Sequence, residues 1–313
     1  MKRYIILVLL VTGIITLCGC NLFCSDECDI VEDYASDFEN ILDEEDIDIG
    51  FFPPLMTGDD ESDSTASGKL ITRANYILNN LTETKYVHTN DMEIDEEKGI
   101  YKYDCSGFIC EFLLKYALED HYNDLYSNYK NYHSKDSRPR AWTFYDYFRD
   151  ILGDDYDKDN PNTCVNQNQY WKVFTSVDSL KKGDIVVVRY HNDWRKKYKQ
   201  EEGTSGSTGH VMIAWSVAYN STGSNANNND VDIKILDSSS SGHYWDTRNE
   251  PHAASVDGTG IGVGWMRYGH SSSASNRPYK YKWKLSSNNY YNLWDGVYNK
   301  YERLEGIIFA RPI

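Results

Sequence analysis

The spacing of the apolar residues changes along this chain from a helical period to a strand period. Up to about residue 152, apolar side chains recur at steps of three or four, as between Ile71 and Leu78. Beyond residue 180 they alternate or form short β-branched runs. The strand-like segments are residues 185–190, 211–217, 231–235 and 307–310. Helices followed by strands predict an α+β fold with a mainly antiparallel sheet.

Three helices and two long loops are expected from local signals. The first helix contains Ile71 to Leu78 and ends near the Asn79-Asn80 pair. The second follows Cys105, with an apolar stripe formed by Phe108, Ile109, Phe112, Leu113 and Tyr116. The third runs from Trp142 to Leu152 and is closed by Gly153. Segments 199–209 and 219–230 are rich in polar and turn-forming residues, so they are expected to be surface loops.

Residues 1–20 have the layout of an export signal. Two basic residues precede an apolar run, and small residues come before Cys20. This end resembles the lipobox of bacterial lipoproteins, which implies cleavage before Cys20 and attachment of lipid to its sulfur. The alternative is an uncleaved membrane anchor, but the apolar run is at the short limit for a helix that spans a bilayer.

Residues 21–68 are expected to form an acidic tether. Of the 48 acidic residues, 16 lie between positions 21 and 64, where there is no Lys or Arg. Dense like charges extend a chain and oppose folding, and no calcium-loop spacing is present. Elsewhere acidic and basic residues nearly balance, so nucleic acid is not an expected partner. Residues 69–313 are expected to form one domain.

The glycines at 258, 260, 262 and 264 superficially match a dinucleotide-binding loop. They precede a strand-like stretch and not a helix, so they are expected to be turn or bulge residues.

Cys105 is the candidate nucleophile in the segment Asp104-Cys105-Ser106-Gly107-Phe108. It stands where a loop meets a helix, and the unpaired amides of the first turn favour a thiolate. Ser106 and Gly107 are small and are expected to leave room for a substrate carbonyl. The alternative is a buried structural cysteine, which is the interpretation that suits Cys110.

A cysteine nucleophile needs a base, and His210 is the candidate. It follows a glycine and begins an alternating apolar strand. Asp237 ends a later strand, and it would lie on the neighbouring strand if residues 219–230 connect a hairpin. There its carboxylate could orient the imidazole of His210.

Four segments resemble successive motifs of the NlpC-like papain-fold cell-wall cysteine peptidases and amidases. They are DCSGF at 104–108, LKKGDIVVV at 180–188, GHVMIAW at 209–215 and IKILDSS at 233–239. The resemblance implies a papain-like fold with N-terminal helices packed on the sheet. It also implies that Cys105 is the nucleophile, His210 the base and Asp237 the orienting residue, with His243 as the competitor for that last role. Relative to the family, the chain has a helical insertion at about 121–175.

The resemblance also implies a substrate subsite. In the peptidase branch, a Tyr ahead of the cysteine and the Asp and Ser beside it bind the free amino end of a cell-wall peptide. Tyr86, Asp104 and Ser106 match these positions. Asp104 has an alternative role as a helix cap, and Tyr86 as a core residue.

The expected function is that of an exported, lipid-anchored cysteine hydrolase in a bacterial cell envelope. Its substrate would be a peptidoglycan stem peptide or a related envelope peptide, cut by an endopeptidase or an amidase reaction. No metal or cofactor is expected. The alternatives are an acyl hydrolase or transferase on the same fold, and a non-catalytic envelope-binding lipoprotein that stacks aromatic residues on sugars.

Overall fold

The computed structural model describes most of the chain that follows the acidic segment. The described residues are 64–88, 91–157, 162–202, 207–221, 226–227, 229–249, 254–255, 257–270, 276–285 and 287–313. All of them belong to one unit, Thr57–Ile313. The expected signal peptide, its Cys20 and most of the expected tether lie outside the described residues. No helix among the described residues is both long and apolar enough to cross a membrane.

The first described helix, α3, spans Ala66–Asn80 and buries one apolar face. The hydroxyl of Thr65 accepts the backbone N–H of Gly68 at 2.9 Å and caps the helix. The end at Asn80 confirms the predicted end of the first helix. Its start lies before the predicted domain boundary at residue 69, so the last residues of the expected tether are helical.

The helix that begins at Cys105 is continuous but changes its winding. It consists of α4 at Cys105–Gly107, the π-helix η2 at Phe108–Leu114, and α5 at Lys115–Ala117. The backbone N–H of Lys115 reaches back five residues to the carbonyl of Cys110. The predicted apolar stripe is buried apart from its last residue, Tyr116, which is exposed.

The other helices lie in the insertion and in loops. They are α6 at Glu119–Tyr132, α7 at Ala141–Leu152, η3 at Gly153–Asp155, η4 at Val177–Ser179, α8 at Asn192–Glu202 and η5 at Thr247–Asn249. Helix α7 ends at Gly153, whose φ of +74° suits glycine, as predicted. The loop predicted at 199–209 begins later, because α8 is built from good helix formers and continues to Glu202.

The strands form two sheets. The small sheet contains β1 at Glu83–Lys85, β2 at Glu93–Asp95 and β3 at Ile100–Lys102. The large sheet contains β4 at Val165–Gln167, β5 at Trp171–Phe174, β6 at Ile185–Tyr190, β7 at Gly209–Ala214, β8 at Tyr219–Asn220, β9 at Asp230–Ser239, β10 at Gly260–His270, β11 at Pro278–Lys282, β12 at Tyr291–Leu293 and β13 at Glu302–Pro312. The four predicted strands correspond to β6, β7, β9 and β13, although β7 ends at Ala214.

The large sheet closes on itself. Its order is β12-β11-β10-β9-β7-β6-β13-β5-β4, and β12 also pairs with β13. Within this sheet the β12–β13 pair is parallel and the other described pairs are antiparallel. Strands β6, β7, β9, β10, β11, β12 and β13 therefore form a closed ring. The class is α+β with a large, mainly antiparallel sheet, which confirms that part of the prediction.

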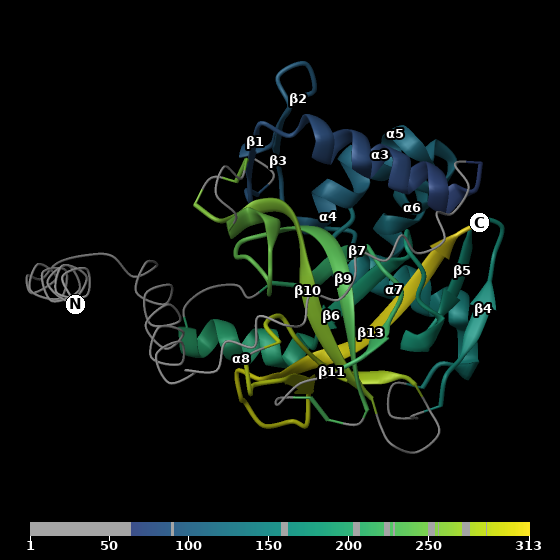
Figure 1. Ribbon diagram of the computed structural model, residues 1–313. Coiled ribbons are helices and arrows are strands. Elements are labelled where there is room, and N and C mark those ends of the chain that lie inside the picture. Colours follow the sequence, from purple (N-terminus) through teal and green to yellow (C-terminus); the bar gives the residue numbers. More distant parts are fainter. Residues whose placement is uncertain are drawn as a thin grey trace, which may run out of the picture. The chain divides into compact units, whose positions relative to one another are not determined.

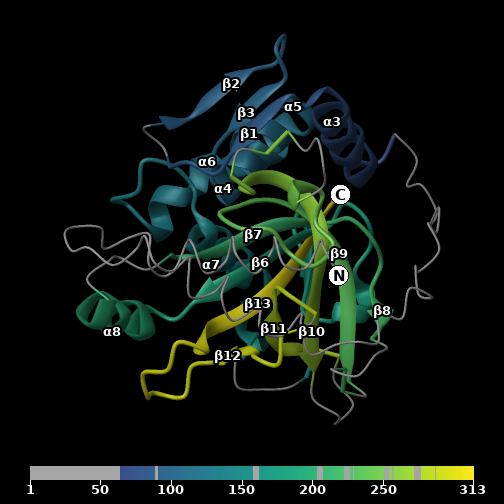
Figure 2. The ribbon, with the colours of Figure 1, turned by 60° about the vertical axis from the view of Figure 1, so that its left-hand side comes forward.

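The two faces of the ring are packed differently. On β6, Ile185 and Val187 belong to the apolar cluster shared with the helices, whereas Val186 and Val188 belong to the cluster inside the ring. Helices α3, α4, α5 and α6 lie together at one end of the ring (Figure 1). Figure 2 shows the small sheet beside the same helices. Cys105 therefore starts a helix at the end of the ring where β7 begins, and α4 contacts β7 and β9.

Candidate active site

Cys105 lies at the capped N-terminus of the continuous helix. The carboxylate of Asp104 accepts the backbone N–H of Gly107 at 2.8 Å. Asp104 therefore caps the helix, which was the alternative to its expected role in substrate binding. The N-terminus of a helix carries a positive partial charge, and Cys105 stands at this end. The residue is 6% exposed, so it is almost entirely buried.

The sequence suggested that Gly107 leaves room for a substrate, but the structure shows that it does not. A Cβ on Gly107 would lie 2.3 Å from the ring of Tyr103, so the missing side chain makes room for that buried tyrosine. The structure therefore corrects this expectation: the space beside Gly107 is filled by the protein itself.

His210 is the second residue of β7, and the residue before it must be a glycine. Gly209 has a φ of +138°, and a Cβ there would lie 2.0 Å from the carbonyl oxygen of Val188. The imidazole Nε2 of His210 lies 2.5 Å from Oδ2 of Asp237. The imidazole also interacts with Cys105, and this interaction contributes to the raised pKa of His210.

Asp237 is the residue that contacts His210, and His243 lies behind it. Strands β7 and β9 pair directly and antiparallel, as the hairpin prediction required, and Asp237 on β9 is fully buried. Nε2 of His243 bonds the same Oδ2 of Asp237 at 2.9 Å. The geometry therefore gives the orienting position to Asp237 and makes His243 a second partner of its carboxylate.

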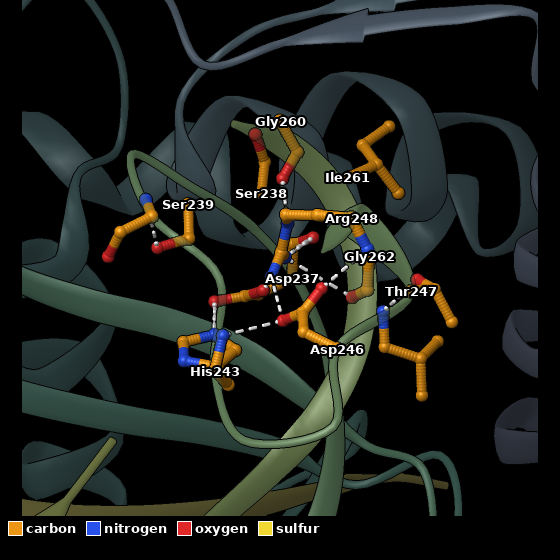
Figure 3. Close-up of polar contacts among 12 residues, drawn as sticks. Asp237, Ser238, Ser239, His243, Asp246, Thr247, Arg248, Gly260, Ile261 and Gly262 are labelled. Atoms are coloured by element: carbon orange, nitrogen blue, oxygen red, sulfur yellow. Dashed lines mark hydrogen bonds and ion pairs between the residues drawn. The ribbon is translucent and has the colours of Figure 1, made fainter. Parts of the chain in front are cut away.

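Arg248 completes a buried charge network that sequence reasoning missed. Its Nη2 donates to Oδ1 of Asp237 and, at 2.9 Å, to the carbonyl oxygen of the same residue. Its Nη1 pairs with Asp246, whose carboxylate also accepts the backbone N–H of His243 at 2.7 Å. Figure 3 shows Arg248 between the two carboxylates. The network fixes Asp237 on the side away from His210.

Two of the four alternating glycines make room for this network. Gly262 and Gly264 lie inside β10, so the expectation that they occupy a turn or bulge is wrong. A Cβ on Gly262 would lie 2.6 Å from Arg248, and one on Gly264 would lie 2.7 Å from Asp246. Their absent side chains create the space that Arg248 and Asp246 occupy. Gly258, with a φ of +69°, does lie in a turn.

The pKa values of His210 and Asp237 are shifted in opposite directions. Burial lowers the pKa of His210, but the negative charge of Cys105 and the hydrogen bond to Asp237 outweigh it, so this pKa is well above its usual value. Burial raises the pKa of Asp237, but the charges of His243 and Arg248 hold it well below its usual value. The two shifts therefore favour a protonated imidazole at His210 beside an ionised carboxylate at Asp237.

The three residues of the predicted subsite lie around Cys105. Tyr86 is half-buried, and burial together with the negative charges of Cys105 and Asp104 raises its pKa. The hydroxyl of Ser106 donates to Oδ1 of Asp104 at 3.2 Å. Arg138, which sequence reasoning did not single out, pairs with Asp104 and donates to Ser106.

Trp283 covers both histidines, a contact that the sequence did not indicate. Its ring lies 5.1 Å from that of His210, edge-on, and stacks on His243 at the same centroid distance. An aromatic ring over the pair limits the access of water to the imidazoles.

The other described cysteines lie apart from this chemistry. Cys110 is fully buried, and burial raises the pKa of its thiol well above the usual value. Cys164 lies in the insertion, 3.7 Å from the hydroxyl of Thr175. The three described cysteines are all free thiols, and no cluster of metal-ligating residues is found in the described part of the chain.

Asp237→Asn is expected to lower the pKa of His210. The amide removes the negative charge beside Nε2, so the imidazolium is stabilised less and loses its proton at a lower pH than in the wild type. An NMR titration of the imidazole measures this directly. Asp150→Asn is the control, because the side chain of Asp150 is 53% exposed and far from the network. An unchanged titration of His210 in Asp237→Asn would contradict the assigned pairing.

Comparison with known proteins found no relative of this chain. No protein-family model, no curated protein and no solved structure matches it.

Proposed function

We propose that this chain is a cysteine hydrolase that cleaves amide bonds in peptidoglycan or a related cell-envelope peptide. The observation that carries the proposal is the continuous contact from Cys105 through His210 to Asp237. A nucleophile, a base and an orienting carboxylate in this order are the requirement of covalent acyl transfer. The opposite pKa shifts of His210 and Asp237 support the same assignment.

The proposed reaction has two steps. The Cys105 sulfur attacks the substrate carbonyl, and the backbone N–H of Cys105 with nearby donors stabilises the oxyanion. His210, as imidazolium, gives its proton to the leaving amine, and an acyl-enzyme remains. Water, deprotonated by His210, then attacks the acyl carbon and releases the carboxylic acid and the thiolate. Asp237 keeps the imidazole oriented throughout.

We also propose a papain-like fold of the NlpC type for the described unit. A helix that begins at the nucleophile, packed against an antiparallel sheet that carries His210 and Asp237 on paired strands, supports it. The four sequence segments that resemble this family include β7 and the C-terminal part of β9. The insertion at about 121–175 contributes α7, which packs against the ring, and most of α6, which packs against α7 and η2.

The proposed location is the bacterial cell envelope, where lipid on Cys20 would anchor the mature chain to a membrane. The support is the sequence of residues 1–20 alone, because these residues lie outside the described part. The acidic segment would then separate the enzyme from the membrane surface.

One surface feature favours sugar binding, on which the envelope-binding alternative depends. Trp245 is 54% exposed, stacks on Tyr244 and has a φ of +46°, which is unusual for a bulky residue. An exposed aromatic pair of this kind can stack on a sugar ring. Trp245 lies in the same loop as His243, so sugar binding and catalysis are compatible.

Incubation of the full chain with purified peptidoglycan tests the proposal. Mass analysis of the released fragments should show new carboxyl termini that depend on Cys105, and the fragment masses identify the bond that is cut. Binding to peptidoglycan without fragment release would favour the envelope-binding alternative. Release of fatty acid or acyl transfer, with intact peptides, would favour the acyl hydrolase or transferase.

A further inference from the structure

The insertion supplies a buried cation to the first turn of the nucleophile helix. Arg138 lies between α6 and α7 and is 4% exposed. Its Nη2 pairs with Oδ2 of Asp104, and its Nη1 donates to Oγ of Ser106 at 2.7 Å. Its guanidinium also lies 4.7 Å from the ring of Tyr103. The planar group is therefore fixed on three sides.

Asp104 has little acceptor capacity left for a ligand. Its Oδ1 accepts the backbone N–H of Gly107 and the hydroxyl of Ser106. Its Oδ2 faces Arg138 and, at 3.6 Å, Nδ1 of the exposed His88. Burial raises the pKa of Asp104, but these partners outweigh it and keep the pKa below the usual value. Its negative charge is therefore already balanced inside the protein.

The hydrogen-bonding capacity of the Ser106 hydroxyl is also occupied by partners within the protein. It donates its proton to Asp104 and accepts a hydrogen bond from Arg138. A substrate ammonium entering this region would lose its hydration and meet a neutral ion pair, with a guanidinium close by. Loss of hydration without a compensating partner is unfavourable, and like charges repel.

We propose that Arg138 occupies the subsite that would otherwise hold a substrate ammonium, so that this enzyme acts on peptides whose amino end is blocked by an acyl group. This inference rests on the proposed function. The substrate class is an N-acylated peptide or a peptide amide-linked to another group, in place of a peptide with a free amino terminus. The insertion thus sets specificity through an internal cation.

Two peptides of identical sequence, one with a free amino terminus and one N-acetylated, test the inference. The wild type is expected to cleave the acetylated peptide with a kcat/KM at least about tenfold higher, since only the free amine carries the unfavourable charge. Arg138→Gln leaves the Asp104 carboxylate without its cation, so the ratio is expected to shift by about tenfold or more toward the free amine. The control is Arg140→Gln, two residues away, whose side chain is 42% exposed; its ratio should equal that of the wild type.

A binding measurement distinguishes a failure of this inference from a failure of the proposed function. In Cys105→Ala, calorimetry with the same two peptides should show tighter binding of the acetylated one, whether or not the wild type hydrolyses it. Tighter binding or faster cleavage of the free amine by a chain with intact Arg138 overturns the inference, and so does binding of neither peptide. Absence of Cys105-dependent cleavage of both peptides and of peptidoglycan refutes the proposed function instead. If Arg138→Gln does not fold, the comparison of the two peptides with the wild-type chain still tests the inference.

Discussion

Cys105→Ala is expected to lower kcat by about 10⁴-fold or more, because the attacking sulfur has no substitute in the site. The fold should survive, since the change removes one atom from a side chain at the end of a helix and leaves the Asp104 cap in place. Release of peptidoglycan fragments measures activity, and circular dichroism with thermal unfolding measures the fold. Activity of Cys105→Ala at the wild-type level would show that the nucleophile is misassigned.

Cys110→Ala is the matched control for this experiment. Both cysteines lie on the same helix, but Cys110 is fully buried and the raised pKa of its thiol keeps it protonated. The variant is expected to retain activity and to lose about 1–2 kcal/mol of stability from the small cavity. In the wild type, iodoacetamide at neutral pH should label Cys105 faster than Cys110, as peptide mapping can show.

Arg248→Met is expected to reduce the free energy of unfolding by about 3–5 kcal/mol, because it leaves two buried carboxylates without a cation. The side chains of Arg248, Asp237 and Asp246 are all 0% exposed or nearly so. For a domain of this size the loss corresponds to a decrease in Tm of roughly 10 °C. Activity should also fall, since Asp237 loses the partner that holds its second oxygen. Thermal unfolding at neutral pH is the measurement.

Arg149→Met is the matched control for the Arg248 substitution. The guanidinium of Arg149 also pairs with two carboxylates, Asp146 and Asp150, but its side chain is 41% exposed. Exposed ion pairs contribute about 0–1 kcal/mol, so this variant should unfold close to the wild type. Equal destabilisation by the two substitutions would contradict the structural role assigned to the buried network.

The sequence was informative about Cys105 and His210 because their positions depend on local features. A polar residue before an apolar helical stripe predicts a helix start, and Gly209 before an alternating strand predicts a fixed strand start. Asp237 needed one additional step, the pairing of two strands joined by a hairpin connection, and the register of β7 with β9 satisfies it. These inferences use local patterns and the pairing of two strands that are close along the chain.

Arg138, Arg248 and Trp283 could not be found in this way, because their partners are set by the tertiary fold. Arg138 lies 34 residues from Asp104, and its loop conformation brings it to the helix. Arg248 is buried only because the loop after β9 folds into the end of the ring. The alternating glycines were the available signal for Arg248: a strand that lacks side chains on one face must pack against something bulky. The sequence alone gives no indication of which residue that is.

The change of winding after Cys105 was also invisible in the sequence. The apolar stripe at steps of one, three and four fits an α-helix, and nothing in the composition of Phe108–Leu114 distinguishes a π-helix from it. Lys115 donates to Cys110 five residues back, which is the π-helical spacing.

The direction in which the nucleophile faces therefore depends on the rotational phase of its helix. In an α-helix each residue advances the rotation by about 100°, and a wider π turn advances it less per residue. Across Phe108–Leu114 this difference accumulates between the end anchored in the core and the end that carries Cys105. A tightening of the segment into α-helical winding would turn the sulfur away from His210 without altering any residue of the site. The catalytic alignment is thus a property of the whole helix, and substitutions that restore regular winding would act on it from a distance.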